Sequence, residues 1–398
     1  MRHLMRLAVI EPTPFGGLLH YATQLADALA DRGNDVDLIV TRDQELAGRA
    51  GGASRRPILA AGAAPTHSGS ATLRRARTAR RLAMTWGRIA METRRGNYDA
   101  VLLNGSLDLA LTATGALAVN AMKGHTPVAH VCHNVRPFDR WGGGDLFVRS
   151  SSTLRLLKRA YPSFDLIFVH GERCLREYEE TWPPTRLEVI PHGDERLFAD
   201  EPPPPAQEPR ILFFGAWRQM KGLGVLMEAF DKLSERQPEV RLTIAGATVP
   251  EEGQADKVMR WARTHGDRVE LRPGYVPVDA VEPLFAESRV VALPYLAAYQ
   301  SGVAHVAMTM RRAIVASDVG DLATVVRESG GGRLVAPGDP AALAEALGTV
   351  VADPQLADQL GARGHSHTLN GSSWPSVAER VEGAFGALLD ERRDKETK

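Results

Sequence analysis

The chain has 398 residues, 48 basic and 48 acidic side chains, a formal net charge of zero and two cysteines. That length suits two domains, the neutral balance argues against nucleic acid as a partner, and two cysteines are too few for a disulfide framework or a zinc cluster. The apolar runs fall short of the roughly 18 residues of a membrane-spanning helix and no signal-peptide pattern opens the chain, so we expect a cytoplasmic protein, soluble or peripheral on the inner face of the membrane.

Strand-like apolar runs alternate with longer amphipathic segments along the first half, which is typical of an α/β fold with parallel sheets. The expected strands are residues 7–10, 36–40, 100–103, 128–132 and 166–169. A helix is expected over 18–32, because this segment is amphipathic and Gly33, a common residue after a helix end, follows it.

A proline-rich segment at 201–208 cannot join a helix or a central strand, so it marks a domain boundary. The alternation then restarts, with strands expected at 210–214, 240–245, 269–271, 290–293, 313–317 and 332–335, and helices at 224–235, 278–286, 303–311 and 340–352. We expect a first domain over 1–195, a second over 196–373, and a helix with a charged tail over 374–398. The fold class is then two Rossmann-like, doubly wound parallel-sheet domains that face each other across a cleft.

Candidate ligand-binding residues in the first half follow strand ends. Gly16 and Gly17 lie between the first strand and the first helix, where backbone N–H groups can approach a ligand; a tight turn is the alternative. His133 and Asn134 follow the fourth of the expected strands, where a histidine can donate to a sugar hydroxyl, or bond locally within the loop. His130 lies inside the strand and is expected in the core. These histidines lack a third ligand at zinc-binding spacing, so no metal site is expected.

Arg218 and Lys221 form the clearest candidate for anion binding. They lie between a Phe-Phe-Gly strand end and the helix that opens near Gly222. Cations are unfavourable at a helix N-terminus unless an anion compensates them, and arginine can bind phosphate through two nitrogens. We therefore interpret this turn as a diphosphate site, with a solvated cationic loop as the alternative.

A second turn, Gln300-Ser301-Gly302-Val303, follows the strand at 290–293 and opens a helix. Its consecutive N–H groups can bind phosphate, while Ser301 can also act as a simple N-cap. Gly246 ends the strand at 240–245 and allows close approach of a nucleotide. His192, beside the expected boundary, is either a ligand contact or a turn residue.

The chain resembles the GT-B glycosyltransferases of the large retaining family four over nearly its full length. The resemblance rests on the motifs above together with three more stretches, Val189-Ile-Pro-His-Gly193, Ala316-Ser-Asp-Val-Gly-Asp321 and Leu334-Val-Ala-Pro-Gly-Asp339. It implies that the C-terminal domain holds a nucleotide sugar, that the N-terminal domain holds the acceptor, and that the last helix packs back on the first domain.

One departure from the family is clear. Most members carry a Glu-x7-Glu motif whose acids bind the donor sugar and the ribose, and the corresponding positions here are Ala298 and Val306. The chain resembles instead the subset with a Gln-Ser-Gly-Val motif. What replaces the acids is left open by the sequence.

The resemblance implies transfer of a hexose-like sugar from a nucleoside diphosphate, with retention of anomeric configuration and no obligatory metal or other cofactor. Arg218, Lys221 and the 301–303 amides would neutralise the leaving diphosphate, and His133 would hold a donor hydroxyl or the acceptor. The acceptor is expected to be a glycan or glycolipid, with a small natural product as the alternative. A sugar-nucleotide epimerase or hydrolase, and a catalytically silent nucleotide-binding subunit, are the other functions considered.

Residues 73–95 contain eight arginines against one acid, Glu92, mixed with Leu73, Leu82, Trp86 and Ile89. A basic amphipathic helix of this kind suits an anionic membrane surface. A solvated helix face is the alternative.

Overall fold

The computed structural model describes residues 4–60, 71–107, 109–136, 151–249 and 253–396. Their contacts divide them into two units. Unit 1 comprises the described residues up to 191 together with 374–396, and unit 2 comprises 192–373. The break follows Pro191, slightly before the expected boundary after residue 195.

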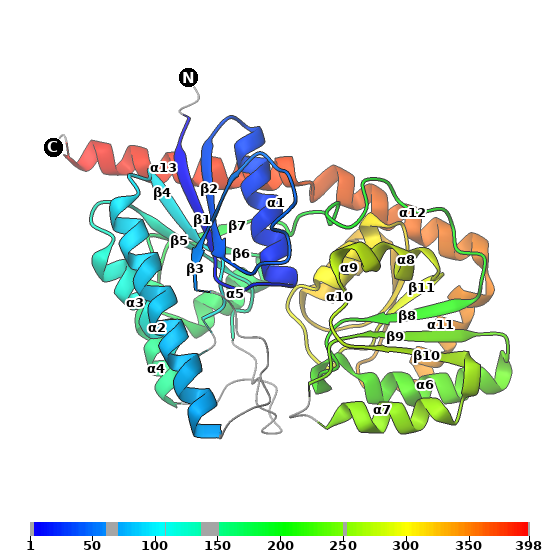
Figure 1. The fold of residues 1–398 in the computed structure, drawn as a ribbon. Coiled ribbons are helices and arrows are strands. Elements are labelled where there is room, and N and C mark those ends of the chain that lie inside the picture. Colours follow the sequence, from blue (N-terminus) through cyan, green and yellow to red (C-terminus); the bar gives the residue numbers. More distant parts are fainter. Residues whose placement is uncertain (1–3, 61–70, 108, 137–150, 250–252, 397–398) are drawn as a thin grey trace. The chain divides into compact units, whose positions relative to one another are not determined.

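Unit 1 is built on a seven-stranded, wholly parallel sheet with strand order β3-β2-β1-β4-β5-β6-β7 (Figure 1). Its strands are β1 Arg6–Glu11, β2 Asp35–Thr41, β3 Ser54–Leu59, β4 Ala100–Leu103, β5 Val128–Cys132, β6 Leu166–Val169 and β7 Leu187–Val189. Its helices are α1 Gly17–Asp31, α2 Ala71–Arg95, α3 Ala110–Met122, α4 Ser151–Ala160, α5 Glu172–Thr181 and α13 Trp374–Glu396, with a 3-10 turn at Tyr161–Ser163.

Unit 2 repeats this plan with a six-stranded parallel sheet of order β10-β9-β8-β11-β12-β13. Its strands are β8 Arg210–Phe214, β9 Arg241–Gly246, β10 Val269–Pro273, β11 Val290–Leu293, β12 Ala313–Ser317 and β13 Gly332–Val335. Its helices are α6 Leu223–Arg236, α7 Gln254–Arg263, α8 Val281–Ala286, α9 Gly302–Thr309, α10 Gly320–Ser329, α11 Pro340–Ala352 and α12 Pro354–Gly371, with 3-10 turns at Gln219–Lys221, Gly266–Arg268 and Val278–Ala280.

Both sheets confirm the expected doubly wound parallel architecture. In each, the strand order reverses once, between β1 and β4 in unit 1 and between β8 and β11 in unit 2. Ligands of open α/β sheets bind beside the carboxyl ends of the strands at such a switch point. The topology therefore directs attention to the loops that follow these four strands.

Helix α13 belongs to unit 1 although all of unit 2 precedes it in the chain. Val377 and Phe385 are fully buried, and the Trp374 ring packs edge-on against Tyr21 of α1 at 5.0 Å between ring centres. Figure 1 shows this helix, in red, lying along unit 1. The described part of the expected tail is helical as far as Glu396, while residues 397–398 lie outside the described residues.

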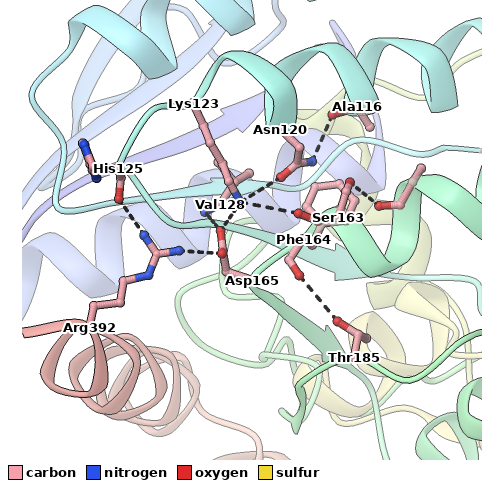
Figure 2. A network of polar contacts seen from close by, with 11 residues as sticks. Ala116, Asn120, Lys123, His125, Val128, Ser163, Phe164, Asp165, Thr185 and Arg392 are labelled. Atoms are coloured by element: carbon pink, nitrogen blue, oxygen red, sulfur yellow. Dashed lines mark hydrogen bonds and ion pairs between the residues drawn. The ribbon is translucent and has the colours of Figure 1, made fainter. Parts of the chain in front are cut away.

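A polar network fixes the far end of α13 (Figure 2). Arg392 donates to Asp165 Oδ1 (2.5 Å) and to the His125 carbonyl (2.6 Å). The other oxygen of Asp165 accepts from the Val128 amide (2.8 Å) and forms an ion pair with Lys123. One carboxylate thus joins α13 to the starts of β5 and β6.

Helix α2 uses its apolar side inside unit 1. Trp86 and Ile89 are buried, and a Cβ on Gly115 of α3 would lie 2.2 Å from the Trp86 ring. These two residues therefore pack inside unit 1. The membrane interpretation of 73–95 requires them on an exposed apolar face, and they are not there. The side chains of 71–75 lie outside the described residues. No helix in the described part of the chain is both long enough and apolar enough to cross a bilayer.

Candidate functional site

The candidate site of unit 2 is formed by two loops that leave adjacent strands at the switch point. The loop after β8 carries Arg218 and Lys221, and the loop after β11 leads into α9. The Leu296 amide donates to the Met220 carbonyl (2.8 Å), and Lys221 Nζ lies 3.7 Å from the centre of the Tyr295 ring. The structure therefore brings together the two stretches that the sequence analysis selected.

Two glycines are required where these loops meet their neighbours. Gly222 has φ 68°, and a Cβ there would lie 1.8 Å from the Pro294 carbonyl oxygen. Gly246 has φ 139°, and a Cβ there would lie 1.9 Å from the Gly215 carbonyl oxygen. Other residues rarely adopt these φ values, so glycine permits both the backbone conformation and the close approach. Gly246 thus has a packing role in addition to the predicted nucleotide contact.

Helix α9 begins at Gly302, with Ser301 as its N-cap. Ser301 Oγ accepts from the Ala304 amide (3.4 Å) and donates to the Tyr295 hydroxyl (3.4 Å). Val303 lies near the β8 loop, since a Cβ built on Gly215 would be 3.8 Å from its Cγ2. The structure shows the capping role of Ser301 directly, and the positive end of the α9 dipole lies beside the turn that carries the two cations.

Glu195 is a residue of this region that the sequence analysis missed. Its side chain is 3% exposed, and its Oε1 lies 3.7 Å from the position of a Cβ on Gly302. Val306, one of the two positions that lack the family's acid, is instead part of the apolar core. A buried carboxylate is therefore present at the start of α9, supplied by a different segment.

His192 also lies against α9. Its ring stacks on the His305 ring with 4.3 Å between ring centres. His305 Nε2 in turn lies 3.5 Å from Gln300 Oε1. Burial lowers the pKa of His192, although its bond to the Gly193 carbonyl and the Asp194 charge act in the opposite direction. The stacked pair of rings connects the segment before β8 to α9.

In unit 1, four polar side chains lie at the carboxyl ends of adjacent strands. They are Glu11, Asn104, His133 and His170, at the ends of β1, β4, β5 and β6. Asn104 donates to Glu11 Oε2 (2.7 Å), and its Oδ1 lies 2.9 Å from His133 Nε2. The remaining nitrogen of His133, Nδ1, is 3.2 Å from His170 Nε2. Both ring nitrogens of His133 are thus engaged within unit 1, so direct donation to a ligand requires one of these bonds to be exchanged.

The N-terminus of α1 already contacts a carboxyl side chain of the protein, that of Glu45. The Gly16 amide donates to Glu45 Oε1 (2.7 Å), and the same oxygen is 2.7 Å from His20 Nε2. A donor phosphate would therefore have to displace Glu45 in order to bind the Gly16 amide. No described atom lies within 4 Å of where a Cβ on Gly16 or Gly17 would be, so the turn has open space beside it.

His130 and Asn134, which lie in and just after β5, make local contacts. His130 is buried, its Nδ1 bonds to the Leu103 carbonyl (3.0 Å), and its ring stacks on Phe164. It is a core residue, as predicted. The carbonyl of Asn134 accepts a bond from the Cys132 thiol. Within the described residues, no group of three or more His, Cys, Asp or Glu side chains is placed to hold a metal ion.

Solved structures share this architecture along almost the whole chain. Sucrose-phosphate synthase from Thermosynechococcus elongatus superposes with a TM-score of 0.75 at 20% identity, covering 97% of this chain and 99% of that one. Anabaena HepE, solved with UDP and glucose, gives a TM-score of 0.71 at 15% identity, covering 96% of this chain and 99% of that one. The two Rossmann-like units are those of the GT-B fold.

Sequence comparisons identify the family. Residues 15–193 match the model described as Glycosyltransferase Family 4, and residues 208–353 match the one described as Glycosyl transferases group 1. The chain belongs to this glycosyltransferase group.

Individual relatives are more distant. A D-inositol 3-phosphate glycosyltransferase of Nocardia farcinica is 30% identical over 46% of this chain, a match that spans only 41% of that enzyme. An alpha-maltose-1-phosphate synthase of Mycolicibacterium smegmatis is 26% identical over 72% of this chain and 83% of its own.

Proposed function

We propose that the protein transfers a hexose-like sugar from a nucleoside diphosphate sugar to an acceptor hydroxyl, with retention at the anomeric carbon. The observation that carries the proposal is the junction of the two switch-point loops in unit 2. It places Arg218, Lys221 and the start of α9 on neighbouring strand ends. The fold is shared with HepE, whose structures contain UDP or UDP-glucose, which supports a nucleotide-sugar donor.

In this proposal the leaving diphosphate is neutralised by Arg218, Lys221 and the amides of Gly302 and Val303. Negative charge develops on the diphosphate as the glycosidic bond breaks, so groups fixed around it stabilise the transition state more than the ground state. Removing one such group typically costs on the order of 2.7–4 kcal/mol of activation free energy. The departing phosphate oxygen then accepts the proton of the attacking hydroxyl.

We assign Glu195 to the donor hydroxyls, in place of the acids missing at Ala298 and Val306. Its carboxylate is buried beside Gly302, within the Gln-Ser-Gly-Val turn. Carboxylates accept hydrogen bonds from sugar hydroxyls, which is the role that the resemblance gives to the missing acids. A variant donor site with a relocated acid accounts for the loss of the usual motif.

The donor proposal is tested by thermal shift and turnover with a panel of nucleoside diphosphates and nucleotide sugars. A ligand at 100 times its dissociation constant adds about 2.7 kcal/mol of stability, a measurable shift. We expect one nucleotide sugar to stabilise the wild type. Arg218→Ala should lose the thermal shift given by the nucleotide sugar and also the shift given by the nucleoside diphosphate alone. Glu195→Gln should keep the shift given by the diphosphate and lose only the additional shift that the sugar provides. Stabilisation without transfer or hydrolysis would favour the silent-subunit function.

For the acceptor we propose a glycan or glycolipid hydroxyl at an anionic membrane surface. The exposed side of α2 carries Arg77, Arg80, Arg88 and Arg95 at helical spacing, with the exposed Met84 and Met91 between them. Each arginine near an anionic surface contributes about 1 kcal/mol. One relative is named a phosphatidyl-myo-inositol mannosyltransferase, from Mycolicibacterium smegmatis, and that name includes a lipid. A small natural product is the second candidate.

Co-sedimentation with phosphatidylserine vesicles at low salt tests this surface. We expect binding by the wild type, loss of binding in Arg77→Gln/Arg80→Gln, and unchanged binding in Arg260→Gln/Arg263→Gln, a matched pair on α7 of unit 2. Absence of wild-type binding would remove the membrane surface and favour the small natural product.

A further inference from the structure

A chain of hydrogen bonds runs across the carboxyl ends of β4, β5, β6 and β7 in unit 1. Each end of this chain is a hydrogen-bond acceptor. One terminus is the Asn104 side-chain oxygen, 2.9 Å from His133 Nε2. The other is the Ile190 carbonyl, 3.3 Å from His170 Nδ1. Between them, His133 Nδ1 and His170 Nε2 are 3.2 Å apart. The number of protons on the two rings follows from these partners.

The orientation of Asn104 is fixed by its other contacts. Its Nδ2 donates to Glu11 Oε2 (2.7 Å) and to the Leu18 carbonyl (2.9 Å). A flipped amide would direct its oxygen at that carbonyl, leaving two acceptors in contact. Oδ1 therefore faces His133, and this oxygen can only accept.

Three hydrogen bonds in a row between two end acceptors require three protons. His133 Nε2 must carry one to donate to Asn104, and His170 Nδ1 must carry one to donate to Ile190. The contact between the rings needs one more proton, on either nitrogen. Two neutral imidazoles have only two ring protons, so one ring must be an imidazolium.

We infer that His133 and His170 together hold three ring protons and one positive charge, balanced by the Glu11 carboxylate on the other side of Asn104. His170, which no motif pointed to, is then a positioning residue that keeps His133 charged and oriented. This inference deepens the proposed function, because it gives His133 the role that the resemblance implies, contact with a donor hydroxyl or the acceptor. It predicts that the site offers its ligand a fixed cation rather than a single neutral donor.

The groups around the pair set the conditions for this charge. Glu11 also accepts from the Thr13 amide (2.7 Å). Burial raises the pKa of Glu11 and the hydrogen bonds from Thr13 and Asn104 offset that shift only in part, so in this inference the neighbouring imidazolium keeps the carboxyl ionised. The Tyr21 ring packs edge-on against both imidazoles, at 4.8 and 5.4 Å, and burial raises the pKa of its hydroxyl, so this neighbour adds no charge.

The two rings titrate as a coupled pair. A fourth proton on the two rings would place two positive charges side by side, so the pair loses it at low pH. The third proton is retained, because the Asn104 and Ile190 oxygens and the Glu11 charge favour the protonated pair. An anionic ligand beside the pair, such as a phosphate, would hold that proton more tightly still.

The experiment is nitrogen-detected NMR of the full-length protein labelled at the histidine rings, titrated from pH 5 to 9 without ligand, with His133→Gln and His170→Gln to assign the signals. We expect three protonated ring nitrogens in the pair at pH 7, and a step to two at higher pH. Two protons at pH 7, whether with Glu11 protonated or with the Ile190 contact unmade, would overturn the inference. This readout does not depend on turnover, so it separates this inference from the proposed function.

The His170→Gln variant supplies a second readout. The glutamine side-chain oxygen can still accept from a protonated His133 Nδ1, so the variant preserves a hydrogen bond but removes the titrating partner. We expect the alkaline limb of kcat/KM to move to lower pH by at least about one unit. An unchanged pH profile in a folded, active variant would show that His170 is only a packing residue.

Discussion

Single residues in this protein acquire their properties from the strand ends on which they lie. His133 and His130 are three positions apart, yet one joins a polar network and the other is a buried core residue. The sequence predicted that difference, because His130 lies inside the strand and His133 lies just past its end. It did not predict His170 or Glu195, since their partners come from distant segments.

Burial lowers the pKa of His130 to about 4, although its bond to Leu103 acts in the opposite direction. The unfolded chain takes up this proton near pH 6.5 and the folded unit only near pH 4, so stability is lost as pH falls through that window. The loss reaches about 3 kcal/mol. We expect His130→Asn, whose amide can still donate to Leu103, to flatten the dependence. Hydrogen exchange of β5 amides measures it.

The exposed His125, changed to Asn in the same way, is the matched control. A wild-type protein whose β5 protection is constant between pH 6.5 and 4 would contradict the assignment of a neutral, buried His130.

At the scale of elements, the sequence predicted every central strand. The expected strands at 210–214, 290–293, 313–317 and 332–335 coincide with β8, β11, β12 and β13. It missed the edge strands β3 and β7. Strand β3 contains two arginines and a proline, which an edge position tolerates but which hide the apolar pattern. Helix α12 was also missed, although Asp353 caps it by accepting from the amides of Gln355 and Leu356.

The junction of the two switch-point loops depends on Gly222. An alanine there would be strained at φ 68° and would drive its Cβ into the Pro294 carbonyl, so we expect a loss of at least about 1–3 kcal/mol. The displaced turn should also weaken donor binding. Urea unfolding and the nucleotide thermal shift measure the two effects.

Gly224, two positions later in α6, is the matched control. A Cβ there would meet no described atom within 4 Å, so Gly224→Ala should stabilise the helix by about 0.5–1 kcal/mol. Equal effects of the two substitutions would show that the contact with Pro294 does not hold the loops together.

At the scale of the whole molecule, two independent sheets carry the candidate residues, and each places them at its own switch point. Periodicity and the position of the proline-rich segment were enough to predict two doubly wound domains. Which loops touch within each unit was only partly predictable. Contacts such as Glu45 with Gly16 arise from packing that no local pattern encodes.

Helix α13 covers unit 1, so its removal should act on that unit first. We expect deletion of residues 374–398 to expose the face of α1 around Tyr21 and to reduce hydrogen-exchange protection in α1 and β1, while β8 and α6 of unit 2 retain theirs. Exchange mapped by mass spectrometry measures this. Equal loss of protection in both units, or none in α1, would contradict the assignment of α13 to unit 1.

The same helix sets an order of events during synthesis. The segment at 192–373 is continuous, so unit 2 can complete its contacts as soon as it leaves the ribosome. Unit 1 emerges earlier but must wait for the whole of unit 2 to be translated before Trp374 and Phe385 reach it. During that delay it presents an uncovered apolar surface. The first unit to be made is therefore the last to be finished, and its nascent form is the stage most in need of a chaperone.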